Sequence, residues 1–237
     1  MEGRKSSYRT WLFVIIICTL GLVCLLYAQG DEASRLAAGE IIAYSENVEG
    51  SDVKRGTVIA TINAPPEIVW QVITDNNRFR EFMPKTLESM LVSPEKLREV
   101  LRKAPRTREE VEKLLGKDPP DLSRFRSVGG LYVVYFYSLL DFPWPVSDKW
   151  YIIKIQRDET RASKNIYSER WDLEIGNLAA NNGYWLLEPY GEGMTKVTYQ
   201  LLTDPGGNIP KSFIEMGTKV TMPDIIRAVR ERAGGRP

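Results

Sequence analysis

The chain has 237 residues, a formal net charge of +1 and no histidine, and both of its cysteines, Cys18 and Cys24, lie in one apolar stretch near the N-terminus. This charge balance gives no indication of a nucleic-acid partner. Because histidine is absent and cysteine is confined to that stretch, the remainder is not expected to hold a zinc or copper site, a Ser–His or Cys–His nucleophile pair, or any cofactor.

Residues 1–28 have the pattern of an export segment. A basic leader precedes an uncharged run from Trp11 to Leu26, and Ala28 supplies a small residue at its end. Positive residues stay on the cytoplasmic side, so the rest of the chain should be translocated. The length fits either a cleaved signal peptide or a retained membrane anchor. We therefore expect an exported domain, periplasmic or extracellular and either free or membrane-anchored, that follows a tether or opening helix at residues 29–38.

The next segment combines strands with short helices. Strands are predicted at 40–47 and 57–63, separated by a turn-rich stretch. A helix should begin at Ala64-Pro65-Pro66-Glu67, because proline is tolerated in the first helical turn and an acidic residue suits its positive end. A short helix running from Phe79 to Pro84 and a strand at 87–92 complete this part.

Residues 94–126 form a charged insert with two helical patterns. Leu97, Val100 and Leu101 have helical spacing, and the same spacing recurs at Val111, Leu114 and Leu115. Two interpretations stay open. The insert is either a pair of satellite helices with solvated outer faces, or a lid or docking surface particular to this protein.

From Gly130 onward the pattern becomes β, and the chain closes with a helix. Short turns between successive strands predict an antiparallel sheet, with strands at 131–140, 149–156, 163–175, 183–189 and 195–203. A long helix should follow from Ile209 to Ala233, with Asn208 as its N-cap and an irregularity at Pro223. Residues 234–237 are expected to be a frayed tail.

Two strings then identify a family resemblance. DFPWPVSDKWYIIK (141–154) resembles the proline–tryptophan loop and following strand of START domains. GMTKVTYQLLTDPGGNIPKSFIEMGTKVTMPDIIRAV (193–229) resembles their last strand, Asp-Pro-Gly-Gly turn and C-terminal helix. The resemblance implies an α+β helix-grip fold over residues 39–233, interrupted by the insert, in which a curved antiparallel sheet wraps around the last helix.

The resemblance also implies a deep apolar cavity between the sheet and that helix. The residues expected to line it are Tyr135, Tyr137, Trp150, Ile152, Lys154, Trp185, Phe213, Met216 and Val220. The loop expected to admit the ligand contains Trp144 and Pro145, with Asp148 orienting it. Aromatic residues in strands also serve simply as core fillers, so this assignment of the aromatic residues has a structural alternative.

The side chain of Lys154 decides which face of its strand is predicted to line the cavity. Trp150, Ile152 and Lys154 share one face of their strand, while Tyr151, Ile153 and Ile155 share the other. The family resemblance places Lys154 in the cavity, near a polar group of the ligand. Alternation alone favours the second set as the inward face and leaves Lys154 solvated.

The function expected from these observations is non-enzymatic binding, with or without transfer, of a lipid or other hydrophobic molecule, with transient or anchored contact to a membrane. One alternative is a cofactor-free cyclase or dehydratase acting on an apolar substrate, since related folds include such enzymes. Another is an interaction module that binds a protein or a membrane surface through residues 94–126.

Overall fold

The computed structural model describes residues 31–51, 53–126, 129–142, 147–207 and 217–234. The chain separates into two units, residues 1–40 and 41–237. In the described part of the first unit, residues 31–37 are helical, and Arg35 Nη2 lies 2.6 Å from Glu40 Oε1. No helix among the described residues has the length and apolarity needed to cross a bilayer. The predicted leader and the tail at 235–237 lie outside the described residues, and so does Asn208.

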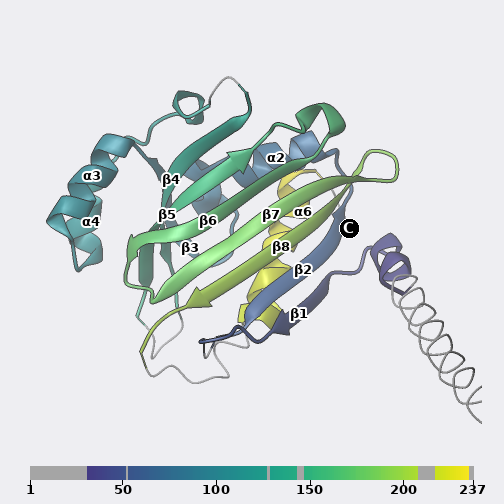
Figure 1. Cartoon of the computed structure of the whole chain (residues 1–237), viewed down its shortest axis with the longest axis horizontal. Coiled ribbons are helices and arrows are strands. Elements are labelled where there is room, and N and C mark those ends of the chain that lie inside the picture. Colours follow the sequence, from purple (N-terminus) through teal and green to yellow (C-terminus); the bar gives the residue numbers. More distant parts are fainter. Residues whose placement is uncertain (1–30, 52, 127–128, 143–146, 208–216, 235–237) are drawn as a thin grey trace, which may run out of the picture. The chain divides into compact units, whose positions relative to one another are not determined.

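The second unit is built on one antiparallel sheet of eight strands, in the order β1-β2-β8-β7-β6-β5-β4-β3 (Figure 1). The strands are β1 (Ile42–Glu46), β2 (Arg55–Ile62), β3 (Thr86–Val92), β4 (Leu131–Leu140), β5 (Lys149–Asp158), β6 (Tyr167–Gly176), β7 (Ala180–Tyr190) and β8 (Met194–Asp204). Four consecutive hairpins connect β4 to β8, and this gives the sheet its simple antiparallel register.

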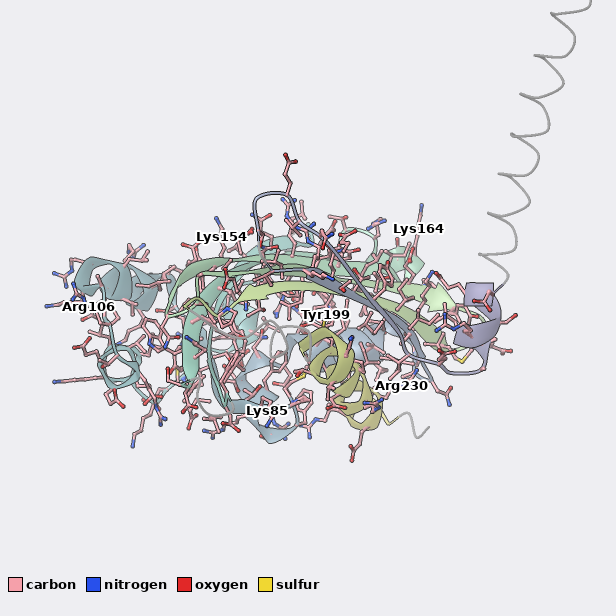
Figure 2. The ribbon with its side chains drawn as sticks, turned by 90° about the horizontal axis from the view of Figure 1, so that it is seen from below. Lys85, Arg106, Lys154, Lys164, Tyr199 and Arg230 are labelled. Atoms are coloured by element: carbon pink, nitrogen blue, oxygen red, sulfur yellow. The ribbon has the colours of Figure 1, made fainter. Side chains whose placement is uncertain are left out.

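The C-terminal helix α6 (Met222–Arg232) lies against the inner face of the sheet together with α2 (Pro66–Thr74) (Figures 1 and 2). Ile226 and Val229 of α6 are fully buried in the main core, as are Val69 and Ile73 of α2. A short 3-10 helix, η1 (Asn76–Glu81), follows α2. Directly before α6, residues Gly217–Thr221 form a π-helical turn, so the helix is irregular where Pro223 predicts it.

The insert forms α3 (Pro94–Lys103) and α4 (Arg108–Leu115) on the opposite, outer face of the sheet. Ser93 caps α3, and a capping box between Thr107 and Glu110 starts α4. Their apolar stripes form a second core with β3, β4 and β5. Lys96 Nζ donates a hydrogen bond to the Leu114 carbonyl, which ties the two helices together.

The observed order of elements confirms the α+β helix-grip class. Several strand boundaries differ from expectation by one to four residues, and two of these differences are informative. Strand β6 begins at Tyr167 rather than residue 163, because a 3-10 turn and Asn165 with a left-handed φ of 56° come first. Strand β5 continues to Asp158 instead of ending at residue 156. The second difference matters for function, because it places Arg157 in the sheet rather than in a turn.

Candidate ligand cavity

A cavity of about 480 Å³ lies between the inner face of the sheet and the start of α6. Four exposed lining residues, Lys54, Lys85, Asp141 and Val220, mark the side on which it opens. Most of the wall is apolar. It includes Phe79, Met83, Phe136, Leu140, Ile153, Ile155, Trp171, Trp185, Leu201, Met222 and Ile225.

Aromatic rings form the part of this wall contributed by β6, β7 and β8. The rings of Trp185 and Tyr199 stack with centroids 4.1 Å apart, and Trp171 stacks on Tyr199 at 6.1 Å. Gly183 makes room for this arrangement, since a Cβ there would lie 2.5 Å from Trp171 Cζ2. Stacked rings have few alternative rotamers, so this side of the cavity is a fixed surface.

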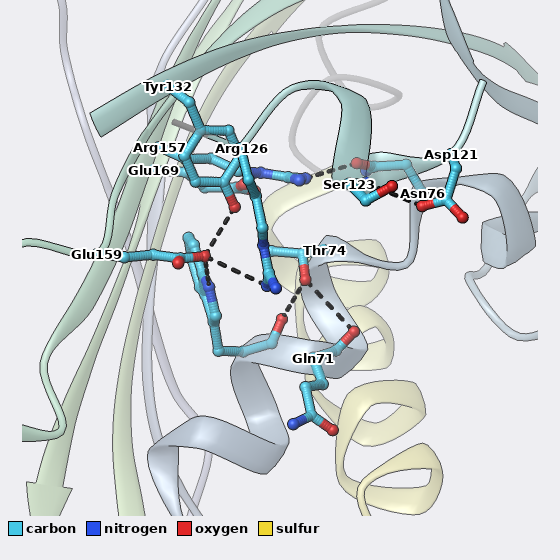
Figure 3. A network of polar contacts seen from close by, with 11 residues as sticks. Gln71, Thr74, Asn76, Asp121, Ser123, Arg126, Tyr132, Arg157, Glu159 and Glu169 are labelled. Carbon is cyan, nitrogen blue, oxygen red and sulfur yellow. Dashed lines mark hydrogen bonds and ion pairs between the residues drawn. The ribbon is translucent and has the colours of Figure 1, made fainter. Parts of the chain in front are cut away.

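A buried ion pair lies at the inner end of the cavity, away from its opening. Arg157 Nε donates to Glu169 Oε2 at 2.8 Å, and Arg157 Nη2 donates to Asn76 Oδ1 at 2.5 Å (Figure 3). Glu169 and Asn76 both line the cavity. Arg157 Nη1 is buried and makes no hydrogen bond to any described residue. Charged groups are costly to bury unless paired, so this pair is a specific feature of the site.

Aromatic rings and a second carboxylate support Arg157. Its guanidinium lies 6.0 Å from the ring centroid of Trp70 and 5.9 Å from that of Tyr132, a geometry in which a cation is attracted to each ring. Glu159 Oε1 accepts hydrogen bonds from Trp70 Nε1 at 2.8 Å and Tyr132 Oη at 2.7 Å (Figure 3). These bonds hold both rings in place beside Arg157.

Burial shifts the protonation equilibria of the groups around the cavity. Desolvation raises the pKa of Glu169 above its usual value, and the neighbouring Arg157 opposes this. Desolvation also raises the pKa of Tyr151 to about 12 and that of Tyr199 still further. The tyrosines are therefore neutral hydrogen-bonding groups near pH 7. No group of three or more His, Cys, Asp or Glu side chains in the described part of the chain could hold a metal ion.

The structure divides the predicted cavity residues into three groups. Trp185 and Val220 line the cavity, and their contact with a ligand stays a prediction. Phe213 and Met216, predicted for the last helix, and Trp144 and Pro145, predicted for the admitting loop, lie outside the described residues. Asp148 is described: its carbonyl accepts a hydrogen bond from Asn177 Nδ2 at 3.1 Å, and its role in the loop stays a prediction.

The placement of the third group, five residues of β4 and β5, is wrong. Tyr135, Tyr137, Trp150, Ile152 and Lys154 lie on the outer face, where all but Lys154 pack in or against the core formed with α3 and α4. Tyr137 Oη even donates to Glu112 Oε1 of α4 at 3.1 Å. Figure 2 shows Lys154 and Tyr199 on opposite sides of the sheet.

The insert explains this error. Because α3 and α4 cover the outer face of β4 and β5, these strands are apolar on both faces, so the apolar residues Trp150 and Ile152 were compatible with the inward orientation that the family resemblance implied. The inward set is Tyr151, Ile153 and Ile155, the set that alternation alone favours. No residue of 94–126 lines the cavity, and the insert therefore forms no part of its wall.

Asn76, Arg157 and Glu169 were not predicted as site residues. Arg157 follows Ile153 and Ile155 at two-residue spacing, so it shares their inward face once β5 is extended by two positions. Register then pairs it directly with Glu169. An inward arginine near the end of one strand and an inward glutamate on the next strand together predict a buried ion pair, and this signal could have identified the two residues from the sequence.

A substitution at Lys154 tests the corrected orientation. Lys154→Met should change the free energy of unfolding by no more than about 0.5 kcal/mol, as is usual for surface positions, and should leave ligand affinity unchanged. Equilibrium urea unfolding and a ligand titration measure the two quantities. A tenfold loss of affinity in a folded Lys154→Met variant would return Lys154 to the cavity.

The comparisons with known proteins agree with this architecture. The family model described as "Polyketide cyclase / dehydrase and lipid transport" matches residues 62–230, most of the second unit. The chain belongs to this family. An uncharacterised protein of Pseudomonas aeruginosa is 34% identical over 84 residues, a match that covers 31% of this chain and 40% of that protein.

Solved structures with the same fold include two lipid transfer proteins. The STAR-related lipid transfer protein of Xanthomonas axonopodis superposes with a TM-score of 0.59 at 21% identity, covering 82% of this chain and 93% of that one. Human StAR-related lipid transfer protein 5 gives a TM-score of 0.57 at 9% identity, covering 91% and 96%. At such identities the likeness concerns the fold alone, and the family includes both binding proteins and cyclases.

Proposed function

We propose that this chain binds one lipid-like molecule in the cavity, with the apolar body of the ligand against the aromatic wall and a polar group near Glu169 and Asn76. The observation that carries the proposal is an apolar cavity with a single buried ion pair at its inner end. Such a site combines a large apolar contact area with a few fixed polar groups, the usual composition of a small-molecule site.

The size of the cavity sets the size of the ligand. About 480 Å³ lies within the range of typical small-molecule pockets, roughly 300–1,000 Å³. Each methylene that leaves water contributes about 0.8 kcal/mol, so a ligand of ten to twelve carbons gains enough to bind with few polar contacts. A single-chain or compact fused-ring lipid fits this description better than a lipid with two long chains.

Binding without turnover is the form of the proposal that the side chains favour. Glu169 is the acidic group in the cavity wall closest to the ligand's inner end, and Arg157 already pairs with it at 2.8 Å. A general acid or base must exchange a proton with the substrate near neutral pH, and the raised pKa values of Tyr151 and Tyr199 make their phenols weak proton donors that are almost never ionised there.

The proposal also includes an activity and a location: the chain transfers its ligand between membranes outside the cytoplasm. The export pattern of residues 1–28 supports the location, and the lipid transfer proteins with the same fold support the activity. A vesicle assay tests it: the full chain should accelerate movement of a fluorescent single-chain lipid from donor to acceptor vesicles. A protein that binds the lipid but leaves this rate unchanged would be a binding protein without transfer activity.

A further inference from the structure

A second polar group lies in the cavity wall, close to its opening. Asn181 of β7 lines the cavity and is only 5% exposed. Its Oδ1 accepts a hydrogen bond from Trp171 Nε1 at 2.9 Å, and its Nδ2 donates to Thr203 Oγ1 at 3.4 Å. Thr203 also lines the cavity. The second bond is long, and an amide nitrogen carries two hydrogens, so Asn181 keeps donor capacity for a ligand.

The register of the sheet fixes the distance between this group and the inner ion pair. Glu169 pairs with Trp185, which lies four positions beyond Asn181 on β7. A strand advances about 3.3 Å per residue, so the two polar groups are about 13 Å apart along the sheet. Glu169 makes its hydrogen bond to Arg157 with Oε2, and no described residue is hydrogen-bonded to its Oε1.

The wall between these two polar groups is mainly apolar. The row of the sheet halfway along contains Ile155, Trp171, Gly183 and Leu201, and the first two are buried. Tyr199 pairs with Trp185 in the same row as Glu169, and its hydroxyl interacts with Tyr151 as well as with Glu169. The hydroxyl of Tyr151 has the side chain of Ser138 as its hydrogen-bond partner. The polar capacity of the wall is therefore concentrated at two ends.

We propose that the ligand carries a polar group at each end of an apolar body, with an acceptor such as a hydroxyl or carbonyl oxygen at Asn181 and Thr203 and a second polar group at Glu169 and Asn76. A ligand with one polar group would leave one of these ends facing hydrocarbon, and an unpaired buried polar group is costly. The inference rests on the proposed function, because it defines the ligand class of the same cavity.

Binding of decanol and of α,ω-decanediol to the full chain tests the inference, because the extended diol is close in length to the separation of the two polar groups. The ratio of their dissociation constants is measured by calorimetry in the wild type, in Asn181→Leu, and in Asn182→Leu. Asn182 is the next residue of β7 and lies on the outer face, so it is the matched control. The diol preference should fall about fivefold or more in Asn181→Leu and stay unchanged in Asn182→Leu.

Two further measurements keep failure interpretable. Thr203→Val preserves the Trp171–Asn181 bond, so it should fold even if Asn181→Leu does not, and it should also lower the diol preference. Hexanediol and hexadecanediol should both bind less tightly than decanediol. If the diol preference of Asn181→Leu and of Thr203→Val equals that of the wild type, the proposal of a ligand with two polar ends is wrong, while the proposal of hydrophobic binding stands. Failure of decanol and all diols to bind overturns the proposed function itself.

Discussion

Glu169→Leu should lower the free energy of unfolding by about 3–5 kcal/mol, the usual cost of removing one partner of a buried ion pair. Arg157 has a side-chain exposure of 0% and its main ionic partner is Glu169, with an exposure of 4%. Without the carboxylate, the guanidinium is left in the core with Asn76 and two aromatic rings as its only described partners. Equilibrium urea unfolding followed by tryptophan fluorescence measures the loss.

The same strand supplies a control for this change. Glu174 lies on β6 and is exposed, so Glu174→Leu should change the free energy of unfolding by no more than about 0.5 kcal/mol. The double variant Arg157→Met/Glu169→Leu should recover much of the stability, because an apolar pair of similar volume replaces the charges. If Glu169→Leu and Glu174→Leu lowered the free energy of unfolding equally, the Arg157–Glu169 ion pair would not stabilise the fold as argued.

Leu201→Trp should block the cavity and reduce ligand affinity by about tenfold or more. Leu201 lies in the cavity wall, and the space over its cross-strand neighbour Gly183 is already filled by the Trp171 ring, so the larger side chain has to extend into the cavity. Tryptophan adds a volume of roughly two methylene groups, and losing the burial of two ligand methylenes costs about 1.6 kcal/mol. A fluorescent fatty-acid displacement assay gives the affinity.

Thr198→Trp is the matched control for this substitution. It introduces the same residue into β8 but on the outer face, because Thr198 is separated from Leu201 by an odd number of positions. This variant should bind ligand as the wild type does. If Leu201→Trp retained wild-type affinity while folded, the ligand would have to bind elsewhere.

The fold could be predicted because local patterns and family motifs agreed over long segments. The turns between β4 and β8 are short, and the residues that start α2, α3 and α4 are ordinary capping and first-turn residues. Hairpin connections leave few topologies to choose from. Two of the strand boundaries that differed from expectation, the start of β6 and the end of β5, depend on a left-handed asparagine and on tertiary pairing.

The site could be predicted only in part, because the face of a strand is a tertiary property. For β5, the sequence offers two apolar faces, and only the packing of α3 and α4 on Trp150 and Ile152 shows which one is outside. The pairing of Arg157 with Glu169 and Asn76 joins residues up to 81 positions apart. No local pattern specifies such a contact. The two-residue spacing of Arg157 from Ile155 does, however, place it on the inward face of β5, and this could have suggested a buried partner.

Native mass spectrometry of the full chain, purified gently from its own host and followed by lipid extraction, tests the central claim most directly. We expect one hydrophobic molecule bound per chain, released on unfolding and lost in the Leu201→Trp variant. A folded protein that carries no such molecule, and that takes up none from a panel of single-chain and fused-ring lipids, would contradict the proposal that this cavity is a lipid-binding site.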